Sequence, residues 1–296
     1  MAHAAGAALD AVIATALAED LGEAGDVTSR AIVPAGAATR AVLVAREPGV
    51  VAGMEAARAA FEAVDPSVEF EALVSDGAHV QAGDALARVS GPARALLAAE
   101  RTALNLLSHL AGVATATAAF VAEVAGTGCA VRDTRKTLPG LRALQKAAVI
   151  AGGGLNHRAG LFDGLLVKDN HIAAAGGVTE ATRRALAGAG GLGLQVEVDS
   201  LEQLDEALTA GARSILLDNF CLNDLHAAVA RCRREAEPVF VEASGGITLP
   251  SAWAIASTGV DAIAVGALTH SARALDIGLD FHPGESGRSA TAGGEV

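Results

Sequence analysis

Lysine is confined to one short part of this chain. The sequence has 22 lysine and arginine residues, but only Lys136, Lys146 and Lys168 are lysines. A lysine ammonium is compact, flexible and titratable, whereas the guanidinium that supplies positive charge elsewhere is planar and permanently charged. Lys136 and Lys168 each follow a predicted strand, and their clustering therefore indicates a functional role. Lys146 falls in the middle of a predicted helix, and we expect it to be a solvated surface residue whose replacement by arginine is nearly silent.

Residues suited to anion binding accompany these lysines. Thr134 and Arg135 directly precede Lys136, and a glycine run leads to His157 and Arg158. Arginine binds a carboxylate through two parallel hydrogen bonds, and glycine lets backbone N–H groups approach an anion closely. The glycines have a second interpretation, which is that they end the preceding helix. The combination predicts a site for small, multiply negative substrates.

Acidic residues and further glycines follow later strands. Glu197 and Asp218 come after neighbouring strands and could hold ribose hydroxyls or a divalent cation, or pair with the basic cluster. Two loops are of the kind that binds phosphate in many barrels, namely Ser244-Gly245-Gly246 and Val265-Gly266-Ala267.

Repeated strand and helix units must position these residues. From about residue 100 a long helix leads into apolar strands that each end in polar residues and precede a helix; we expect them near 129–133, 165–167, 194–198, 214–217, 239–241 and 262–265. Such alternation implies parallel strands with crossover helices. Fewer strands are visible than the eight of a complete barrel, so we predict an incomplete, open α/β barrel of about six to seven strands, with a doubly wound sheet as the alternative. In either fold, ligands bind at the carboxyl ends of the strands.

The first hundred residues have a different pattern. An Ala-rich helix over about 7–21 precedes short alternating segments such as 40–45 and a helix near 55–64, which predicts a small α/β domain. The turns within 74–89 are spaced like those of biotinyl and lipoyl carriers, but no lysine is present for attachment. We therefore expect an N-terminal domain at 1–110, a barrel at 111–267 and a flexible tail at 285–296.

Composition excludes several classes of partner. The net charge of -12 argues against nucleic acid or an anionic membrane surface. The uncharged run between Arg101 and Glu123 is long enough for a membrane helix, but its polar residues favour a buried amphipathic helix. The chain has three cysteines without CxxC spacing, so neither a disulfide framework nor a zinc site is indicated. No lysine or arginine precedes Arg30, so the Ala-rich start lacks the positively charged region of a secretory signal. We expect a soluble, cytoplasmic protein.

Several segments closely resemble the quinolinate phosphoribosyltransferase family. The three most specific are Asp133-Thr134-Arg135-Lys136-Thr137-Leu138-Pro139-Gly140-Leu141-Arg142, Gly152-Gly153-Gly154-Leu155-Asn156-His157-Arg158 and Lys168-Asp169-Asn170-His171-Ile172. The similarity extends to Gly25-Asp26-Val27-Thr28, Glu100-Arg101-Thr102, Val196-Glu197-Val198, Leu217-Asp218-Asn219, Glu242-Ala243-Ser244-Gly245-Gly246-Ile247 and Val265-Gly266. It covers nearly the whole chain, up to about Phe281.

The resemblance implies a fold and a reaction. The fold would be an open α/β barrel with an N-terminal α/β sandwich that also receives the C-terminal segment, at about 268–284. The reaction would join quinolinate to phosphoribosyl pyrophosphate with loss of carbon dioxide, giving nicotinate mononucleotide and pyrophosphate in NAD biosynthesis, with Mg²⁺ as cofactor. Arg101 resembles an arginine that the family donates from a neighbouring subunit, which implies a homodimer.

The resemblance also implies residue roles. Catalysis would rest on Lys136, Lys168, Glu197 and Asp218. Quinolinate would bind Arg101, Thr134, Arg135, Lys136, His157, Arg158 and Lys168. Phosphoribosyl pyrophosphate would bind Glu197, Asp218, Ser244, Gly245, Gly246, Val265, Gly266 and Ala267, and Glu197 and Asp218 would serve the metal.

Three other functions stay open at this point. A nicotinate phosphoribosyltransferase would have a similar architecture but would bind one carboxylate and release no carbon dioxide. A non-catalytic carrier would use the hairpin at 74–89. A paralogue with the same fold would act on another ligand.

Overall fold

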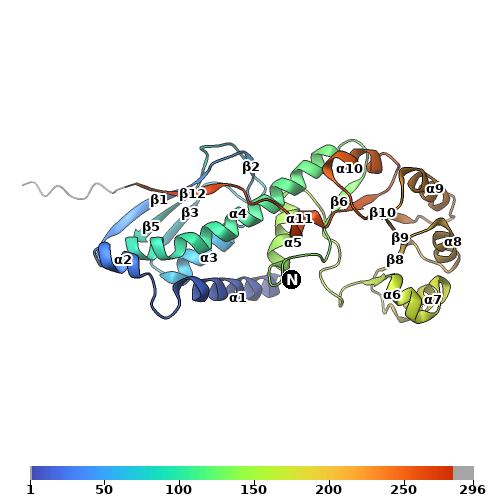
Figure 1. The fold of residues 1–296 in the computed structure, drawn as a ribbon, viewed down its shortest axis with the longest axis horizontal. Coiled ribbons are helices and arrows are strands. Elements are labelled where there is room, and N and C mark those ends of the chain that lie inside the picture. The colour runs from blue at the N-terminus through green and yellow to red at the C-terminus, as the bar shows by residue number, and fades with distance from the viewer. Residues whose placement is uncertain (1, 283–296) are drawn as a thin grey trace, which may run out of the picture. The chain divides into compact units, whose positions relative to one another are not determined.

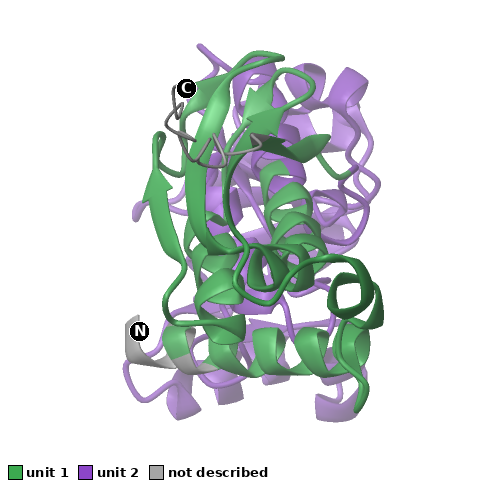
Figure 2. Cartoon of the chain, turned by 90° about the vertical axis from the view of Figure 1, so that its left-hand side faces the viewer, with its two compact units in different colours: residues 1–111, 274–296 green, residues 112–273 purple. Residues whose placement is uncertain are grey.

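Residues 2–282 are described by the computed structural model of the protein, and the predicted tail at 285–296 lies outside them. The chain divides into two compact units (Figure 2). Unit 1 comprises residues 1–111 and 274–296, and unit 2 comprises residues 112–273. The predicted division between residues 110 and 111 lies next to this boundary.

A four-stranded antiparallel sheet forms the centre of unit 1. Its strand order is β12-β1-β5-β3, with bounds β1 (Ala38–Ala45), β3 (Glu69–Ala72), β5 (Ala85–Pro92) and β12 (Ile277–His282). The end of the described chain lies beside β1 (Figure 1), where Val42 is paired with Asp280. Alternate residues of β1, such as Leu43 and Ala45, are buried, as expected for a sheet with one covered face.

Helices complete the core of unit 1. The core cluster takes residues from α3 (Met54–Val64) and from the first part of α4 (Ala93–Glu123), and the unit also contains α1 (Ala2–Leu21) and α2 (Val27–Ile32). Helix α3 begins where the Asp76 carboxylate accepts hydrogen bonds from the backbone N–H groups of Gly53 and Met54. Phe61 of α3 and Leu96 of α4 are fully buried in the same hydrophobic cluster as Leu43.

The segment predicted as a carrier-like hairpin is divided between two sheets. Strand β4 (His79–Val80) pairs with β2 (Gly49–Val50) in a separate two-stranded sheet. Strand β5, which follows it, pairs with β1 and β3. Residues 74–89 therefore do not form a self-contained hairpin, and the carrier hypothesis loses its structural basis.

Helix α4 is long and apolar enough to cross a membrane, and within residues 2–282 it alone meets that criterion. It has 31 residues, and 56% of its most apolar stretch is buried inside the protein. Leu96, Leu107 and Ala111 belong to the hydrophobic cluster of unit 1. A buried helix of a folded protein can be as long and as apolar as a membrane helix. Since these residues are packed in the hydrophobic cluster, α4 is a core helix, as the sequence predicted.

Six parallel strands form the sheet of unit 2. Their order is β6-β11-β10-β9-β8-β7, and their bounds are β6 (Ala130–Arg132), β7 (Leu165–Val167), β8 (Leu194–Val198), β9 (Ser214–Asp218), β10 (Phe240–Ser244) and β11 (Ala262–Ala264). The helices between and after them are α5 (Arg142–Ala151), α6 (Asp169–Ala175), α7 (Val178–Gly188), α8 (Leu201–Thr209), α9 (Leu222–Cys232), α10 (Leu249–Ala256) and α11 (Ala267–His270).

The sheet of unit 2 is open, because β6 and β7 are its two edges. Leu155 adds one isolated parallel bridge to Arg132 beside β6. The prediction of an α/β fold with an open set of six to seven parallel strands is confirmed. Parallel strands bring their carboxyl ends to one edge of the sheet, so the polar residues that follow them gather there.

Candidate functional site

An ion pair joins the ends of the neighbouring strands β7 and β8. The Lys168 ammonium bonds to the Glu197 carboxylate. The Lys168 side chain is 43% exposed and that of Glu197 is 15% exposed, so the pair is accessible from solvent at the ends of these strands. Asp218, at the end of β9, accepts a hydrogen bond from the Asn219 side-chain amide at 2.7 Å. The structure thus pairs Lys168 with Glu197 and places Asp218 at the end of β9, the strand next to the one that carries Glu197.

The loops after β6 and β11 meet. Thr134 Oγ1 accepts a hydrogen bond from the Lys136 backbone N–H at 3.0 Å. A side-chain carbon built on Gly266 would lie 3.3 Å from Lys136 Cδ and 3.4 Å from Thr134 Oγ1. A larger residue at 266 would crowd both neighbours. The predicted phosphate loop at 265–267 therefore lies against the predicted quinolinate residues. Val265 is buried, and its N–H donates to the Arg132 carbonyl oxygen.

Glycine is required at 245. Gly245 and Gly246 both have positive φ angles, of 96° and 59°. A side-chain carbon on Gly245 would collide with Asn219 Oδ1. Asn219 itself has a φ of 58°, and its backbone N–H donates to the Ser244 carbonyl oxygen at 2.9 Å. Asn219 therefore holds the Ser244–Gly246 loop, a role that the sequence did not assign.

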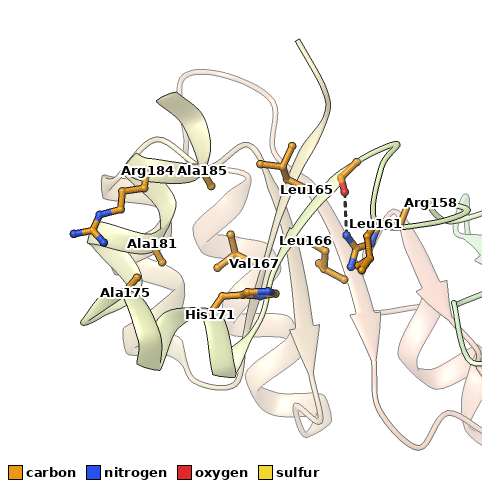
Figure 3. Close-up of a pocket in the computed structure, with 11 residues that line it drawn as sticks. Arg158, Leu161, Leu165, Leu166, Val167, His171, Ala175, Ala181, Arg184 and Ala185 are labelled. Carbon is orange, nitrogen blue, oxygen red and sulfur yellow. Dashed lines mark hydrogen bonds between the residues drawn. The ribbon is translucent and has the colours of Figure 1, made fainter. Parts of the chain in front are cut away.

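Arg135 and Arg158 repel each other, and each has a guanidinium nitrogen without a hydrogen-bond acceptor in the described chain. Nε of Arg135 and Nε of Arg158 are both buried and form no hydrogen bond within residues 2–282. Burial lowers the pKa of Arg158, and repulsion from Arg135 lowers it further. Arg158 Nη1 donates to the Gly164 carbonyl oxygen at 2.9 Å, the dashed line in Figure 3. An anion placed between the two guanidinium groups would satisfy both and relieve their repulsion.

Lys146 is buried, so the expectation of a solvated surface residue was wrong. Its ammonium donates to Asp133 Oδ1 at 2.5 Å and to the His157 carbonyl oxygen at 2.9 Å. Side-chain exposure is 6% for Lys146 and zero for Asp133. Burial raises the pKa of Asp133 and lowers that of Lys146, while their mutual bond opposes both shifts. Lys146 sits mid-helix, but α5 turns this face toward the sheet.

The imidazole of His157 is fully engaged inside the protein. Its Nε2 lies 2.8 Å from Gln195 Oε1, and its Nδ1 accepts the Arg158 backbone N–H at 2.7 Å. Burial, together with the nearby charges of Arg132, Lys146 and Arg158, lowers the pKa of His157 to about 4. The ring is therefore neutral at physiological pH and adds no positive charge to the basic cluster.

The glycine run before His157 ends helix α5 and packs against α4. Gly152 is the C-cap of α5. Side-chain carbons built on Gly152 and Gly154 would each lie 2.7 Å from atoms of the Thr117 side chain. The close approach of two helices explains these glycines, which favours the helix-ending interpretation over an anion cradle.

Arg101 lies in unit 1, on the exposed surface of α4. Its guanidinium forms no hydrogen bond or ion pair with any residue in 2–282. The alternative of an ion pair with Glu100 is therefore not realised.

The acidic residues of unit 2 offer few metal ligands. No group of three or more His, Cys, Asp or Glu side chains within residues 2–282 could hold a metal ion. Glu197 and Asp218 supply carboxylate oxygens on adjacent strands, and Glu197 is already paired with Lys168. One or two carboxylates completed by substrate phosphates and water is the usual Mg²⁺ arrangement, so this donor set fits a substrate-borne magnesium ion.

A cavity of about 340 Å³ opens at the edge strand β7, against α6 and α7 (Figure 3). Its wall is mostly apolar, and Leu161 and Leu166 lie beside Arg158 in this view. The lining residues are Arg158, Leu161, Gly164, Leu165, Leu166, Val167, His171, Ala175, Ala181, Arg184 and Ala185. An apolar surface beside an arginine suits a flat ring that carries a carboxylate.

Comparison with known proteins gives consistent matches along the chain. The family model "Quinolinate phosphoribosyl transferase, N-terminal domain" matches residues 26–111, and "Quinolinate phosphoribosyl transferase, C-terminal domain" matches residues 113–280. The nicotinate-nucleotide pyrophosphorylase (carboxylating) of Mycobacterium leprae is 52% identical over 271 residues, covering 91% of this chain and 95% of that protein. The probable enzyme of the same name from Bacillus subtilis is 43% identical over 88% of this chain and 89% of its own length.

Solved structures show the same similarity. The nicotinate-nucleotide pyrophosphorylase of Francisella tularensis superposes with a TM-score of 0.88 at 37% identity, covering 93% of this chain and 96% of that one. Human nicotinic acid phosphoribosyltransferase superposes with a TM-score of 0.64 at 15% identity, covering 91% of this chain and 73% of that one, and shares the fold alone.

Removing the buried ammonium should destabilise unit 2. Lys146→Met leaves the Asp133 carboxylate buried beside an apolar chain, and we expect a loss of about 3–5 kcal/mol of unfolding free energy, measured by urea denaturation. Arg184→Met, which breaks an exposed pair with Glu180 on α7, is the control and should cost less than about 1 kcal/mol. Equal losses would contradict the buried pair. Lys146→Arg should also carry a cost, because a planar guanidinium must replace a point charge there.

His157 should make stability depend on pH. Between its ordinary pKa of 6.5 and its folded pKa of about 4, the unfolded chain binds a proton that the folded chain does not. This contribution therefore lowers stability as the pH falls through that window, by up to about 3 kcal/mol. His157→Gln retains an N–H donor for Gln195 and removes the titration. Urea denaturation from pH 7 to 4 should show a shallower loss for the variant, whereas parallel profiles would refute the assignment.

Proposed function

Because this chain belongs to the quinolinate phosphoribosyltransferase family, we propose that it transfers the phosphoribosyl group of phosphoribosyl pyrophosphate to quinolinate with decarboxylation, as a step of NAD biosynthesis. The ring nitrogen of quinolinate forms a bond to the anomeric carbon, and the bond from that carbon to pyrophosphate breaks. The ring carboxylate next to nitrogen then leaves as carbon dioxide, and a proton takes its place. The products are nicotinate mononucleotide, pyrophosphate and carbon dioxide.

The unsatisfied arginine pair carries this proposal. Arg135 and Arg158 each retain a buried Nε without a hydrogen-bond partner in the described chain. Holding two cations together in a partly buried site is costly unless an anion binds there. Quinolinate has two adjacent carboxylates and could engage both arginines, with Leu161 and Leu166 beside Arg158 as an apolar wall for its ring (Figure 3). Thr134 and Lys136 add donors beside Arg135, Lys168 adds one after β7, and the His157 ring accepts the Arg158 backbone N–H.

The acidic residues suit the phosphoribosyl donor. When pyrophosphate departs, positive charge develops on the ribose ring, and the Glu197 and Asp218 carboxylates stabilise that charge and hold the ribose hydroxyls. Lys136 and Lys168 counter the charge of the pyrophosphate and of the quinolinate carboxylates. Once the ring nitrogen carries the ribose, its positive charge stabilises the carbanion that decarboxylation leaves. Orientation and electrostatics account for most of the catalysis.

Backbone N–H groups of two loops would hold the 5'-phosphate. Gly245 and Gly246 adopt left-handed backbone conformations that residues with a side chain rarely take, and glycine lets backbone N–H groups approach an anion closely. The loops are Ser244-Gly245-Gly246 and Val265-Gly266-Ala267. Because the Val265 side chain is buried and its N–H is already used, that residue supports the loop, and Gly266 and Ala267 provide the free backbone.

Magnesium would enter with the phosphoribosyl donor. Glu197 and Asp218 are the residues that would hold it, and the ion would neutralise the departing pyrophosphate. Lys168 must then release the Glu197 carboxylate or share it with the magnesium ion.

A homodimer with Arg101 shared between subunits is the assembly we propose. Arg101 is exposed in unit 1 and has no partner within residues 2–282, so it is available to a second copy. The net charge of -12 favours small-molecule substrates, bound through a local basic site, over nucleic acid or membrane surfaces. A cytoplasmic location follows from the same proposal.

Nicotinate phosphoribosyl transfer is the competing activity, since the human enzyme named for it shares the fold. Purified protein with the phosphoribosyl donor and Mg²⁺ should release carbon dioxide from quinolinate and form the nucleotide, while nicotinate gives little. Nucleotide from nicotinate without carbon dioxide from quinolinate would contradict the proposal. Chelation of the metal should abolish turnover.

Lys136→Arg should lose most activity, by about 100-fold or more in kcat/KM. The charge is unchanged, but a guanidinium is larger and planar, and a side-chain carbon built on Gly266 would already lie 3.3 Å from Lys136 Cδ. Arg183→Lys on helix α7 is a charge-conserving control outside the site and should stay within about twofold. Equal behaviour of the two variants would remove Lys136 from the mechanism.

Mixing two inactive variants should test the shared site. Arg101→Ala and Lys136→Ala should each be nearly inactive, with KM for quinolinate raised in the first. If Arg101 acts across subunits, a mixture of the two should recover about a quarter of normal activity, because half of the sites form in mixed dimers and half of those are intact. A mixture no more active than its components, although subunit exchange is demonstrated by mass spectrometry, would show that Arg101 does not act across the interface.

A further inference from the structure

The hydrogen-bond partners of His157 fix where its proton lies. On one side, the Arg158 backbone N–H points at Nδ1 from 2.7 Å. A backbone N–H can only donate, so Nδ1 must accept and cannot carry a proton.

The other side of the ring gives the same answer independently. Gln195 Nε2 donates to Glu242 Oε2 at 2.7 Å, and Arg132 Nη1 donates to the same oxygen at 2.8 Å. That oxygen therefore accepts, which turns the Gln195 amide nitrogen toward Glu242 and its amide oxygen toward His157. The Gln195 oxygen lies 2.8 Å from His157 Nε2, which must then be the protonated nitrogen.

We propose that Gln195 and Glu242, ordered by Arg132, are positioning residues that hold His157 as the neutral Nε2–H tautomer and thereby fix the backbone of Arg158. The consequence for catalysis rests on the proposed function, since Arg158 is one of the two arginines offered to quinolinate. In a cationic His157 ring, Nδ1 would also carry a proton. Its N–H would then face the Arg158 backbone N–H, and because two donors repel each other, the Arg158 segment would be displaced. No role was assigned to Gln195 from the sequence, where it reads as one polar residue inside a strand.

Charged groups from every neighbouring element act on this ring. Arg132 of β6, Lys146 of α5 and Arg158 lower its pKa, and burial lowers it most. The Glu242 carboxylate, 3.9 Å from Nε2, and the buried Asp133 are the opposing charges. The cations and burial prevail, and the pKa of His157 falls to about 4. The neutral ring is therefore stable across the physiological range, and the site's positive charge comes from arginine and lysine alone.

The chain of contacts also explains a buried charge. Glu242 has zero exposure, and its Oε1 has no hydrogen-bond partner within residues 2–282. Burial raises its pKa, and Arg132 and Gln195 oppose that shift. An apolar residue at 242 would remove the acceptor of Arg132 Nη1 and of Gln195 Nε2. The buried Glu242 carboxyl thus has a structural role. It orients the Gln195 amide, and that amide in turn orients the His157 ring.

Nuclear magnetic resonance of the full chain measures the tautomer directly. The protein is labelled with ¹⁵N in histidine, and His157 is assigned by the signal lost in His157→Gln. We expect a neutral ring protonated on Nε2 from pH 7 down to about pH 5. A cationic ring or an Nδ1–H tautomer at pH 7 would overturn the proposal. This result does not depend on activity, so an inactive protein with the expected tautomer would refute only the proposed function.

A pair of glutamine variants tests the positioning role. Gln195→Leu keeps the volume but removes the acceptor for Nε2, and we expect the His157 nitrogen signals to shift. KM for quinolinate should rise about tenfold, with kcat and KM for the phosphoribosyl donor within about twofold of normal. Gln203→Leu on α8 removes a glutamine that bonds to the Asp199 backbone instead, and it should change neither. Unchanged signals and KM in Gln195→Leu would refute the role, as would a fall in kcat alone.

Discussion

The buried carboxylate of Asp133 connects the parts of unit 2 that carry the candidate site. Its Oδ1 accepts from the Lys146 ammonium and from the His157 backbone N–H at 2.7 Å. The Asn156 side chain, oriented so that its amide nitrogen faces acceptors, donates to Oδ2 at 2.6 Å. One side chain thus ties the end of β6 to α5 and to the segment before β7. Because a buried charge tolerates little displacement from its partners, the backbone segments that precede Arg135 and Arg158 are held in place.

That rigidity allows positive charge to be concentrated in an acidic protein. Arg135 and Arg158 repel each other and retain unsatisfied nitrogens, so the free enzyme stores a cost that an anionic substrate relieves. Lys168 avoids this cost by pairing with Glu197. The neutral His157 does so by sharing both ring nitrogens with uncharged partners. The site therefore contains two arginines that lack an anionic partner, Arg135 and Arg158, and one lysine, Lys168, whose charge Glu197 already neutralises.

The open sheet is what makes room for this arrangement. In a closed barrel β6 and β7 would pair, whereas here they are edges. The chain between them bridges to β6 at Leu155 and reaches β8 through the contact from His157 to Gln195. The loops after β9 and β10 are also closely packed. Asn219 and Gly245 both have left-handed backbone conformations, and a side-chain carbon on Gly245 would collide with Asn219.

The sequence by itself determined the class of fold, the order of the strands along the chain and most of the residues at their carboxyl ends. It could do so because strand and helix periodicity are local, and because parallel strands bring their ends together whatever their lateral order. Only the tertiary structure decided which lysine is buried. The sequence placed Lys146 on a helix and Lys136 and Lys168 after strands, but the direction in which α5 turns Lys146 depends on its packing against the sheet. The same holds for Gln195 and Glu242, which are isolated polar residues in apolar strands until the sheet places them around His157. Hydrogen bonds between strands that are distant in sequence leave no local signal, and for that reason the proton on His157 could be placed only from the folded chain.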